Sequence, residues 1–263
     1  MSKLVDLLQK LHKSPAPLGF GLAQTAPALK RMLVIARLSG EPGERLVTVI
    51  SSSADALALV SPGGLPVEAP ASFALPTAIP TGMWLDAGSP LVSRGDTAWD
   101  FVACGPDGPM DVLAWKDMAC LIRVASGMEG SRLRAIADLG ADAVVLSSED
   151  LELGRILGAV ECRRVRLTSG KPVLLQMTSA LTPLQVAVLW KAGVDGIIVD
   201  AAGEGEVLAQ ARAAVEKASY DMRNGGASGP VSIGAHLAQT EEAPVEEREE
   251  EGDDDEEEPD EDE

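Results

Sequence analysis

The fold is decided by residues 171–203, which read KPVLLQMTSALTPLQVAVLWKAGVDGIIVDAAG. A short apolar run begins at Pro172. It is followed by a helix signal, in which Thr182 is suited to cap the helix and Pro183 to occupy its first turn. Gly193 stands where a glycine commonly ends a helix, and a second apolar run follows it. The stretch therefore predicts a strand, a helix and a second strand, the repeating unit of a parallel sheet.

One motif from this stretch occurs four times in the chain: a small or turn-forming residue and an aspartate precede an apolar run. The four copies are residues 53–60, 98–103, 140–146 and 193–199. In the last two copies a glycine stands two residues before the aspartate, after a segment with helical periodicity. The repeated unit is therefore a helix, a glycine turn, an aspartate and a buried strand.

Four further apolar runs alternate with these copies along the chain. They are residues 32–36, 82–85, 119–122 and 172–175. All are short and continuous, as strands are in a parallel sheet that helices cover on both faces. Eight parallel strands with intervening helices close into a barrel that leaves no exposed edge. We therefore predict an α/β fold, a single (β/α)8 TIM-type barrel; the rival architecture is an open doubly wound sheet.

The chain divides into three parts by composition. Residues 241–263 hold 17 acidic residues and one arginine, which account for −16 of the net charge of −19. Such a block of like charges repels itself and buries no apolar surface, so we expect a disordered acidic C-terminal tail. The predicted parts are an N-terminal amphipathic helix with its lead-in at 1–18, the barrel at 19–223, and a linker with the acidic tail at 224–263.

Several helices can be placed from their periodicity. Residues 127–139, 181–192 and 204–222 have the spacing of apolar residues that helices require. Residues 1–13 form an amphipathic helix through four leucines, Leu4, Leu7, Leu8 and Leu11. That helix either plugs the floor of the barrel or packs on a second subunit. The connections at 61–82 and 86–95 are rich in proline and glycine and allow only short helices.

The stretch at 171–203 resembles the last quarter of the ribulose-phosphate-binding barrels and related phosphate-binding barrels. Residues 192–199 resemble the run into their eighth strand, and residues 139–145 resemble their sixth strand. The resemblance implies the barrel fold rather than one activity. In those families a glycine-rich loop after the seventh strand and the end of the eighth hold a phosphate. Here Asp200 and Glu204 follow the eighth strand, and their carboxylates would repel a phosphate at that spot.

Candidate functional residues lie at the carboxyl ends of the predicted strands, where TIM barrels carry their active sites. They are Arg37, Asp86, Arg123, Ser126, Gln176 and Asp200. In one interpretation the two arginines grip a carboxylate or phosphate, and Ser126 and Gln176 also bind the substrate. Asp86 or Asp200 then acts as a general base or metal ligand. In the other interpretation the four charged residues form a structural salt-bridge network in the barrel mouth.

Two functions follow from these interpretations. The first is a barrel that binds a small anionic metabolite and catalyses a lyase- or isomerase-like reaction. The second is a barrel without catalysis, a pseudoenzyme. It acts as a scaffold or protein-interaction module through its acidic tail or its N-terminal helix, and the tail would bind a basic protein.

The residues that are missing exclude several chemistries. The two histidines, His12 and His236, are too few for a histidine zinc site and lie away from the strand ends. No lysine is placed at the carboxyl end of a strand for Schiff-base chemistry. We expect no cofactor. Magnesium, held by Asp86, Asp200 and Glu149, is the one metal that the residues allow.

The cysteines and the overall composition bear on compartment and partners. Cys104 ends the fourth predicted strand, and we interpret it as a buried structural thiol because no histidine is available to activate it. Three widely spaced cysteines form no disulfide framework, which favours a reducing compartment. There is no signal-peptide pattern, no long apolar span and no basic patch. We therefore expect a cytoplasmic protein that binds neither membrane nor nucleic acid.

Overall fold

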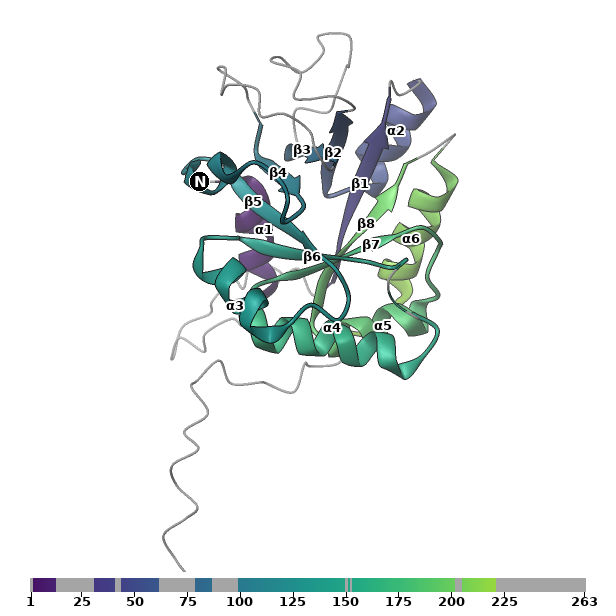
Figure 1. The fold of residues 1–263 in the computed structure, drawn as a ribbon. Coiled ribbons are helices and arrows are strands. Elements are labelled where there is room, and N and C mark those ends of the chain that lie inside the picture. Colours follow the sequence, from purple (N-terminus) through teal and green to yellow (C-terminus); the bar gives the residue numbers. More distant parts are fainter. Residues whose placement is uncertain are drawn as a thin grey trace, which may run out of the picture. The chain divides into compact units, whose positions relative to one another are not determined.

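The computed structural model describes residues 2–12, 31–40, 44–61, 79–86, 99–149, 151, 153–201 and 205–220. Eight parallel strands form one closed barrel in chain order, with β8 beside β1 (Figure 1). The strands are β1 (Leu33–Ser39), β2 (Ala56–Ser61), β3 (Thr81–Leu85), β4 (Phe101–Cys104), β5 (Ala119–Val124), β6 (Ala143–Ser147), β7 (Val173–Met177) and β8 (Val194–Asp200). Each overlaps one of the eight predicted runs. The predicted barrel is confirmed, and the open sheet is wrong.

Helices cover the outside of this barrel. They are α2 (Glu44–Ser53), α3 (Gly130–Asp138), α4 (Ile156–Ser169), α5 (Pro183–Ala192), α6 (Glu206–Lys217) and a 3-10 helix, η1 (Met110–Ala114). Neighbouring helices pack on one another in the order α3, α4, α5, α6, α2. None of the helices in the described ranges is long and apolar enough to cross a membrane.

Three of these six helices were predicted, and α2, α4 and η1 were not. The structure confirms α3, α5 and α6, and α5 begins as expected, with the Thr182 hydroxyl accepting a hydrogen bond from the Gln185 backbone. The α2 sequence is rich in β-branched residues, which favour strands. In α4 the apolar side chains of Ile156 and Leu157 are exposed while Gly158 is buried, so no regular apolar stripe marks the helix. The proline- and glycine-rich connections at 62–78 and 87–98 lie outside the described residues.

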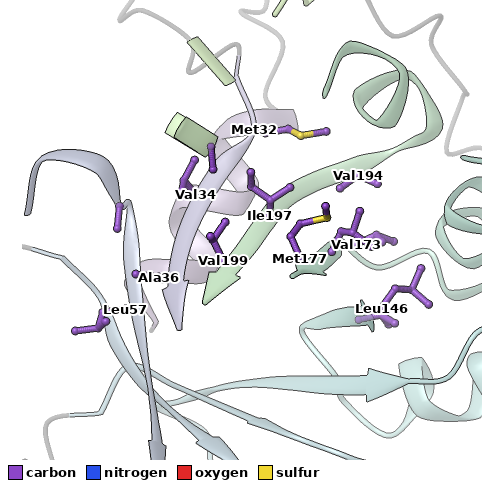
Figure 2. Packing of buried hydrophobic residues seen from close by; sticks show 14 of the residues in the cluster. Met32, Val34, Ala36, Leu57, Leu146, Val173, Met177, Val194, Ile197 and Val199 are labelled. Atoms are coloured by element: carbon purple, nitrogen blue, oxygen red, sulfur yellow. The ribbon is translucent and has the colours of Figure 1, made fainter. Parts of the chain in front are cut away.

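The outward faces of the strands and the inner faces of the helices form the larger core. Val34 and Ala36 of β1 lie beside Ile197 and Val199 of β8 in this layer (Figure 2). Residues two apart on a strand share a face, so each strand contributes alternate residues to it. Burying each large apolar side chain here contributes about 1.5–3 kcal/mol.

The intervening residues point into the barrel and form a second core. Leu33 and Ile35 of β1 belong to it, together with Trp84, Phe101 and several alanines. Leu4 and Leu8 of α1 (Lys3–His12) are buried in the same cluster. The N-terminal helix therefore plugs the barrel with its apolar face, as one of the two predictions has it. That face is not free to pack on a second subunit.

The repeated aspartates lie at the amino ends of β2, β4, β6 and β8, on the barrel floor. Three of them accept a hydrogen bond from a backbone N–H of the preceding strand. Asp55 binds Val34 N at 2.9 Å, Asp142 binds Cys120 N at 2.8 Å, and Asp195 binds Val173 N at 3.0 Å. The motif therefore fastens consecutive strand pairs together at their amino ends.

The fourth repeated aspartate has a different partner. Asp100 accepts hydrogen bonds from the Ser2 hydroxyl at 2.8 Å and from the backbone N–H groups of Lys3 and Leu4 at 2.6 and 2.9 Å. These N–H groups open α1 and have no partner within the helix. Asp100 thus caps the N-terminal helix from the floor and holds it in the barrel.

Residues 224–263 lie outside the described part of the chain. The expected linker and disordered acidic tail, and the part boundaries at 18 and 223, therefore stay predictions. The same holds for a cytoplasmic location.

Candidate functional site at the barrel mouth

The last inward-facing residues of four strands are polar. Arg37 follows Ile35 by two positions, Arg123 follows Leu121, and Gln176 follows Leu174, and each of these preceding residues belongs to the interior core. Asp200 stands in the same relation to Ile198 of β8. Alternation along a strand therefore directs all four side chains into the barrel near its carboxyl rim. The barrel mouth is the surface formed by these residues together with Trp84 and Asp86.

Both arginines contact one tryptophan. The central guanidinium carbons of Arg37 and Arg123 each lie 5.0 Å from the ring centroid of Trp84. In an eight-stranded barrel, inward side chains from alternate strands form layers of four. Arg37, Trp84, Arg123 and Gln176 come from β1, β3, β5 and β7 and belong to one such layer. A layer that is aliphatic in most barrels is here charged and aromatic.

Arg37 forms a short ion pair with the neighbouring strand. Its Nη1 lies 2.7 Å from Oδ1 of Asp200, and the two residues are register partners on β1 and β8. The arginine side chain is 17% exposed and the aspartate 40% exposed. The carboxylate therefore lies on the solvent side of the pair.

Arg123 is held more loosely. Its Nη1 lies 3.9 Å from Oδ1 of Asp86, and its Nη2 donates a hydrogen bond of 2.5 Å to the carbonyl of Leu85. Here too the carboxylate is the more exposed partner, at 50% against 26%. A solvent-exposed pair at this separation contributes little, about 0–1 kcal/mol.

The charge of Arg123 is disfavoured by its surroundings. Burial lowers the pKa of Arg123, and the nearby positive charge of Arg37 lowers it further, while Asp86 and Asp107 act in the opposite direction. Two like charges are thus held close together in a half-buried place. An additional negative charge at this spot would be stabilised by both guanidinium groups.

The remaining predicted residues are placed less tightly. Ser126 lies in the turn that follows β5, and Gln176 is half-buried in the mouth layer. Glu149 is exposed in the turn after β6, where its backbone N–H donates to the Ser147 hydroxyl at 3.2 Å. Among the residues that the structure describes, no three histidine, cysteine, aspartate or glutamate side chains cluster in a way that would hold a metal. A magnesium site at Asp86, Asp200 and Glu149 stays a prediction.

The cysteines lie in the barrel wall. Cys104, which ends β4, lies near enough to Arg123 that the hydrogen bond with Cys120 and the arginine charge together lower the pKa of its thiol, against the effect of burial. All three are buried and free, and Cys104 and Cys120 belong to the layer between strands and helices. The hydrogen bond with Cys104, together with burial, raises the pKa of the Cys120 thiol. A structural rather than nucleophilic role for Cys104 agrees with this position.

Sequence reasoning missed one residue of the mouth, Trp84, and one nearby charge, Asp107. Trp84 is one of four tryptophans scattered along the chain, so the sequence indicates only a packing role for it. Asp107 belongs to the turn of residues 105–108, and its charge raises the pKa of Arg123. A glycine-rich turn directly after a strand at the catalytic end of a barrel was the available signal for Asp107.

Comparison with known proteins supports the fold alone. No protein-family model and no curated protein matches the chain. It is similar to a protein of Aquifex aeolicus VF5, with 12% identity and a TM-score of 0.53, over 80% of this chain and 98% of that one. A mutant tryptophan synthase α-subunit from Pyrococcus furiosus has 16% identity and a TM-score of 0.51, over 71% and 97%. A ligand-free mutant tryptophan synthase from M. tuberculosis has 13% identity and a TM-score of 0.51, over 82% of this chain and 99% of that one. These likenesses confirm the barrel, and at the level of fold they agree with the resemblance seen in residues 171–203.

Proposed function

We propose that the barrel binds a small anionic metabolite at its mouth, with Arg37 and Arg123 as the anchoring residues. The observation that supports this most strongly is the contact of both guanidinium groups with one indole, at the end of the barrel where TIM-barrel enzymes carry their active sites. Guanidinium groups bind carboxylate and phosphate through charge-assisted hydrogen bonds. Gln176 of the same layer and Ser126 of the β5 turn would add neutral hydrogen bonds to the ligand.

The two carboxylates give the mouth a capacity for proton transfer. Asp200 and Asp86 are each about half exposed and each lies beside one of the arginines. A carboxylate next to an anchored anion can remove a proton from a neighbouring carbon, the first step of many isomerase and lyase reactions. We therefore propose lyase- or isomerase-like chemistry, with Asp86 or Asp200 as general base.

The proposed reaction uses no resident cofactor. Magnesium is the exception to be examined, because the carboxylates of Asp86 and Asp200 are oxygen ligands and the metal needs only one or two of them besides substrate and water. Adding magnesium to each binding measurement shows whether the two carboxylates act as a general base or as metal ligands. An anion affinity that rises with magnesium would assign the carboxylates to the metal.

A thermal-shift and calorimetry series on the full chain tests the anion site. The panel consists of inorganic phosphate and small phosphorylated and dicarboxylic acids. We expect at least one anion to stabilise the protein, and Arg37→Ala and Arg123→Ala each to weaken that anion's binding about tenfold or more. Arg132→Ala, which removes an exposed arginine of α3, is the matched control. Unchanged binding in both mouth variants, or no stabilisation by any anion, would contradict the proposal.

The second candidate function is a non-catalytic interaction module. The version that uses the N-terminal helix is disfavoured, because Leu4 and Leu8 are buried in the barrel. The version that uses the acidic tail is supported by the charge of residues 241–263, which suits a basic protein partner. Deleting those residues without losing any partner in a pull-down would count against it.

A further inference from the structure

Trp84 contacts two like charges at once. It is the fourth of the five residues of β3 and is 1% exposed, and its ring has a cation at 5.0 Å in two separate contacts. The face of an indole carries negative potential, and each such contact is favourable. The ring therefore offsets part of the repulsion between the arginines while it fills the barrel interior beside them.

The arginines have few other interactions to orient them. The buried Nε atoms of Arg37 and Arg123 meet no acceptor in the described part of the chain. Arg37 is otherwise held by the partly exposed Asp200, and Arg123 by the Leu85 carbonyl and the distant Asp86. A guanidinium group that is held through one Nη atom alone is oriented less firmly than one bonded at two atoms, and a flat ring against it limits the remaining rotation. The indole is the flat surface that both arginines share.

We infer that Trp84 is a positioning residue of the mouth: it sets the spacing and orientation of Arg37 and Arg123 so that one anion can be bound by both. This rests on the proposed anion site. Trp84 itself is too deeply buried to touch a ligand at the rim and acts through the arginines. Removing the ring should therefore weaken anion binding, whereas retaining an aromatic face should preserve most of it.

The test compares two substitutions in the full chain, with inorganic phosphate as the probe. We expect Trp84→Leu to weaken phosphate binding about tenfold and Trp84→Phe to weaken it less than threefold, since phenylalanine retains a π-face. Trp190→Leu is the matched control. It truncates another buried tryptophan, one that packs edge-on against Tyr220 rather than against the mouth arginines. It should lower stability and leave phosphate affinity unchanged.

A second readout requires no variant that could fail to fold. The ring current of Trp84 should shift the Nε–H resonances of Arg37 and Arg123 in the nuclear magnetic resonance spectrum of the wild-type protein, and phosphate should shift them again. The shift should persist in Trp84→Phe. Arginine resonances without a ring-current shift would overturn the inference, as would a Trp84→Leu variant that folds and binds phosphate like wild type.

The two proposals fail in different ways. Loss of phosphate binding in Arg37→Ala with none in Trp84→Leu would leave the anion site intact and remove the positioning role. Wild-type protein that binds none of the anions would overturn the proposed function. The ring-current measurement would in that case still decide whether Trp84 orients the arginines.

Discussion

The floor and the mouth of the barrel both contain aspartates beside arginines, yet the two ends use them differently. On the floor, Asp195 is fully buried, accepts a backbone N–H from Val173 and lies 3.2 Å from Arg166. At the mouth, Asp200 is 40% exposed and its one hydrogen bond in the described part of the chain comes from Arg37. The floor carboxylates are thus built into the strand pairing. The mouth carboxylates are paired only with side chains and remain open to solvent.

This difference indicates which end of the barrel can bind a ligand and which end serves stability. A carboxylate bonded to backbone N–H groups cannot leave its partner without opening the sheet, so it contributes to stability. A partly exposed arginine that is paired with a solvent-exposed carboxylate can exchange the carboxylate for another anion at small cost. Substitutions at the floor should therefore change stability, and substitutions at the mouth should change binding.

The largest expected effect is at the most buried floor residue. Asp195→Ala leaves Arg166 without its carboxylate and the Val173 N–H without an acceptor. Breaking a buried ion pair by removing one partner costs about 3–5 kcal/mol. Urea unfolding should show this loss, with Asp138→Ala, an exposed aspartate at the end of α3, as the control. A loss below about 1 kcal/mol would mean that the floor aspartates are not structural.

The next effect depends on pH. Burial by itself would raise the pKa of Asp55, but hydrogen bonds from Arg31, the Val34 backbone and Arg212 outweigh it and hold the pKa below the ordinary value of 3.8. The folded state therefore binds this proton less readily than the unfolded chain does. The resulting stabilisation is complete well above pH 3.8 and is lost as the pH falls below that value towards the folded pKa.

Asp55→Asn tests this dependence of stability on pH. It should lower the free energy of unfolding by about 2 kcal/mol at pH 6, because charged hydrogen bonds are lost. The difference in the free energy of unfolding between variant and wild type should be smaller at pH 3 than at pH 6. Urea unfolding at both pH values measures it, and a gap that is the same or wider at the lower pH would show that Asp55 does not carry the effect.

A smaller effect is expected where the floor holds α1. Asp100→Ala removes the cap from the first turn of that helix, at a cost of about 1–2 kcal/mol. Hydrogen exchange of the backbone amides from Leu4 to Leu8 should accelerate, and the barrel amides should change little. Asp111→Ala, at an exposed position in η1, provides the control. Equal acceleration throughout the barrel would indicate that α1 and the strands unfold as one unit.

The smallest effect on stability belongs to the mouth. Asp200→Asn should change the free energy of unfolding by less than about 1 kcal/mol. The same change frees Arg37 from its internal carboxylate, so phosphate affinity should rise up to about fivefold. Calorimetry with phosphate measures the affinity. A large loss of stability together with unchanged affinity would place Asp200 with the floor aspartates and erase the contrast between the two ends.

Much of the fold could be predicted because parallel strands covered by helices leave a simple pattern. The eight apolar runs are each bounded by glycine, proline or charge, and their number and order lead directly to a closed barrel. The helices were harder. The β-branched α2 and the α4 helix, with its exposed Ile156 and Leu157, lack the periodic stripe on which prediction depends.

The sequence places the charged residues Arg37, Asp86, Arg123 and Asp200 at the strand ends, but it misses Trp84 and does not give the pairings. Arg37 and Asp200 are 163 residues apart and meet only because β8 closes against β1. Two arginines could be assigned to the mouth from the strand ends. That both would contact Trp84 depends on the register of three strands, which sequence spacing does not specify. The floor aspartates were recognised as a repeat, yet their backbone partners follow only from the strand pairing.

The cap on α1 has a consequence for the order in which the molecule assembles. The carboxylate that holds the first helix stands 96 to 98 residues further along the chain. During synthesis the leucines of that helix therefore emerge long before the strands that will enclose them. The helix has no burial site until β4 exists, and the ring around it is complete only when β8 joins β1. We therefore expect α1 to enter the barrel late in folding, and its apolar face to stay exposed and prone to association until then.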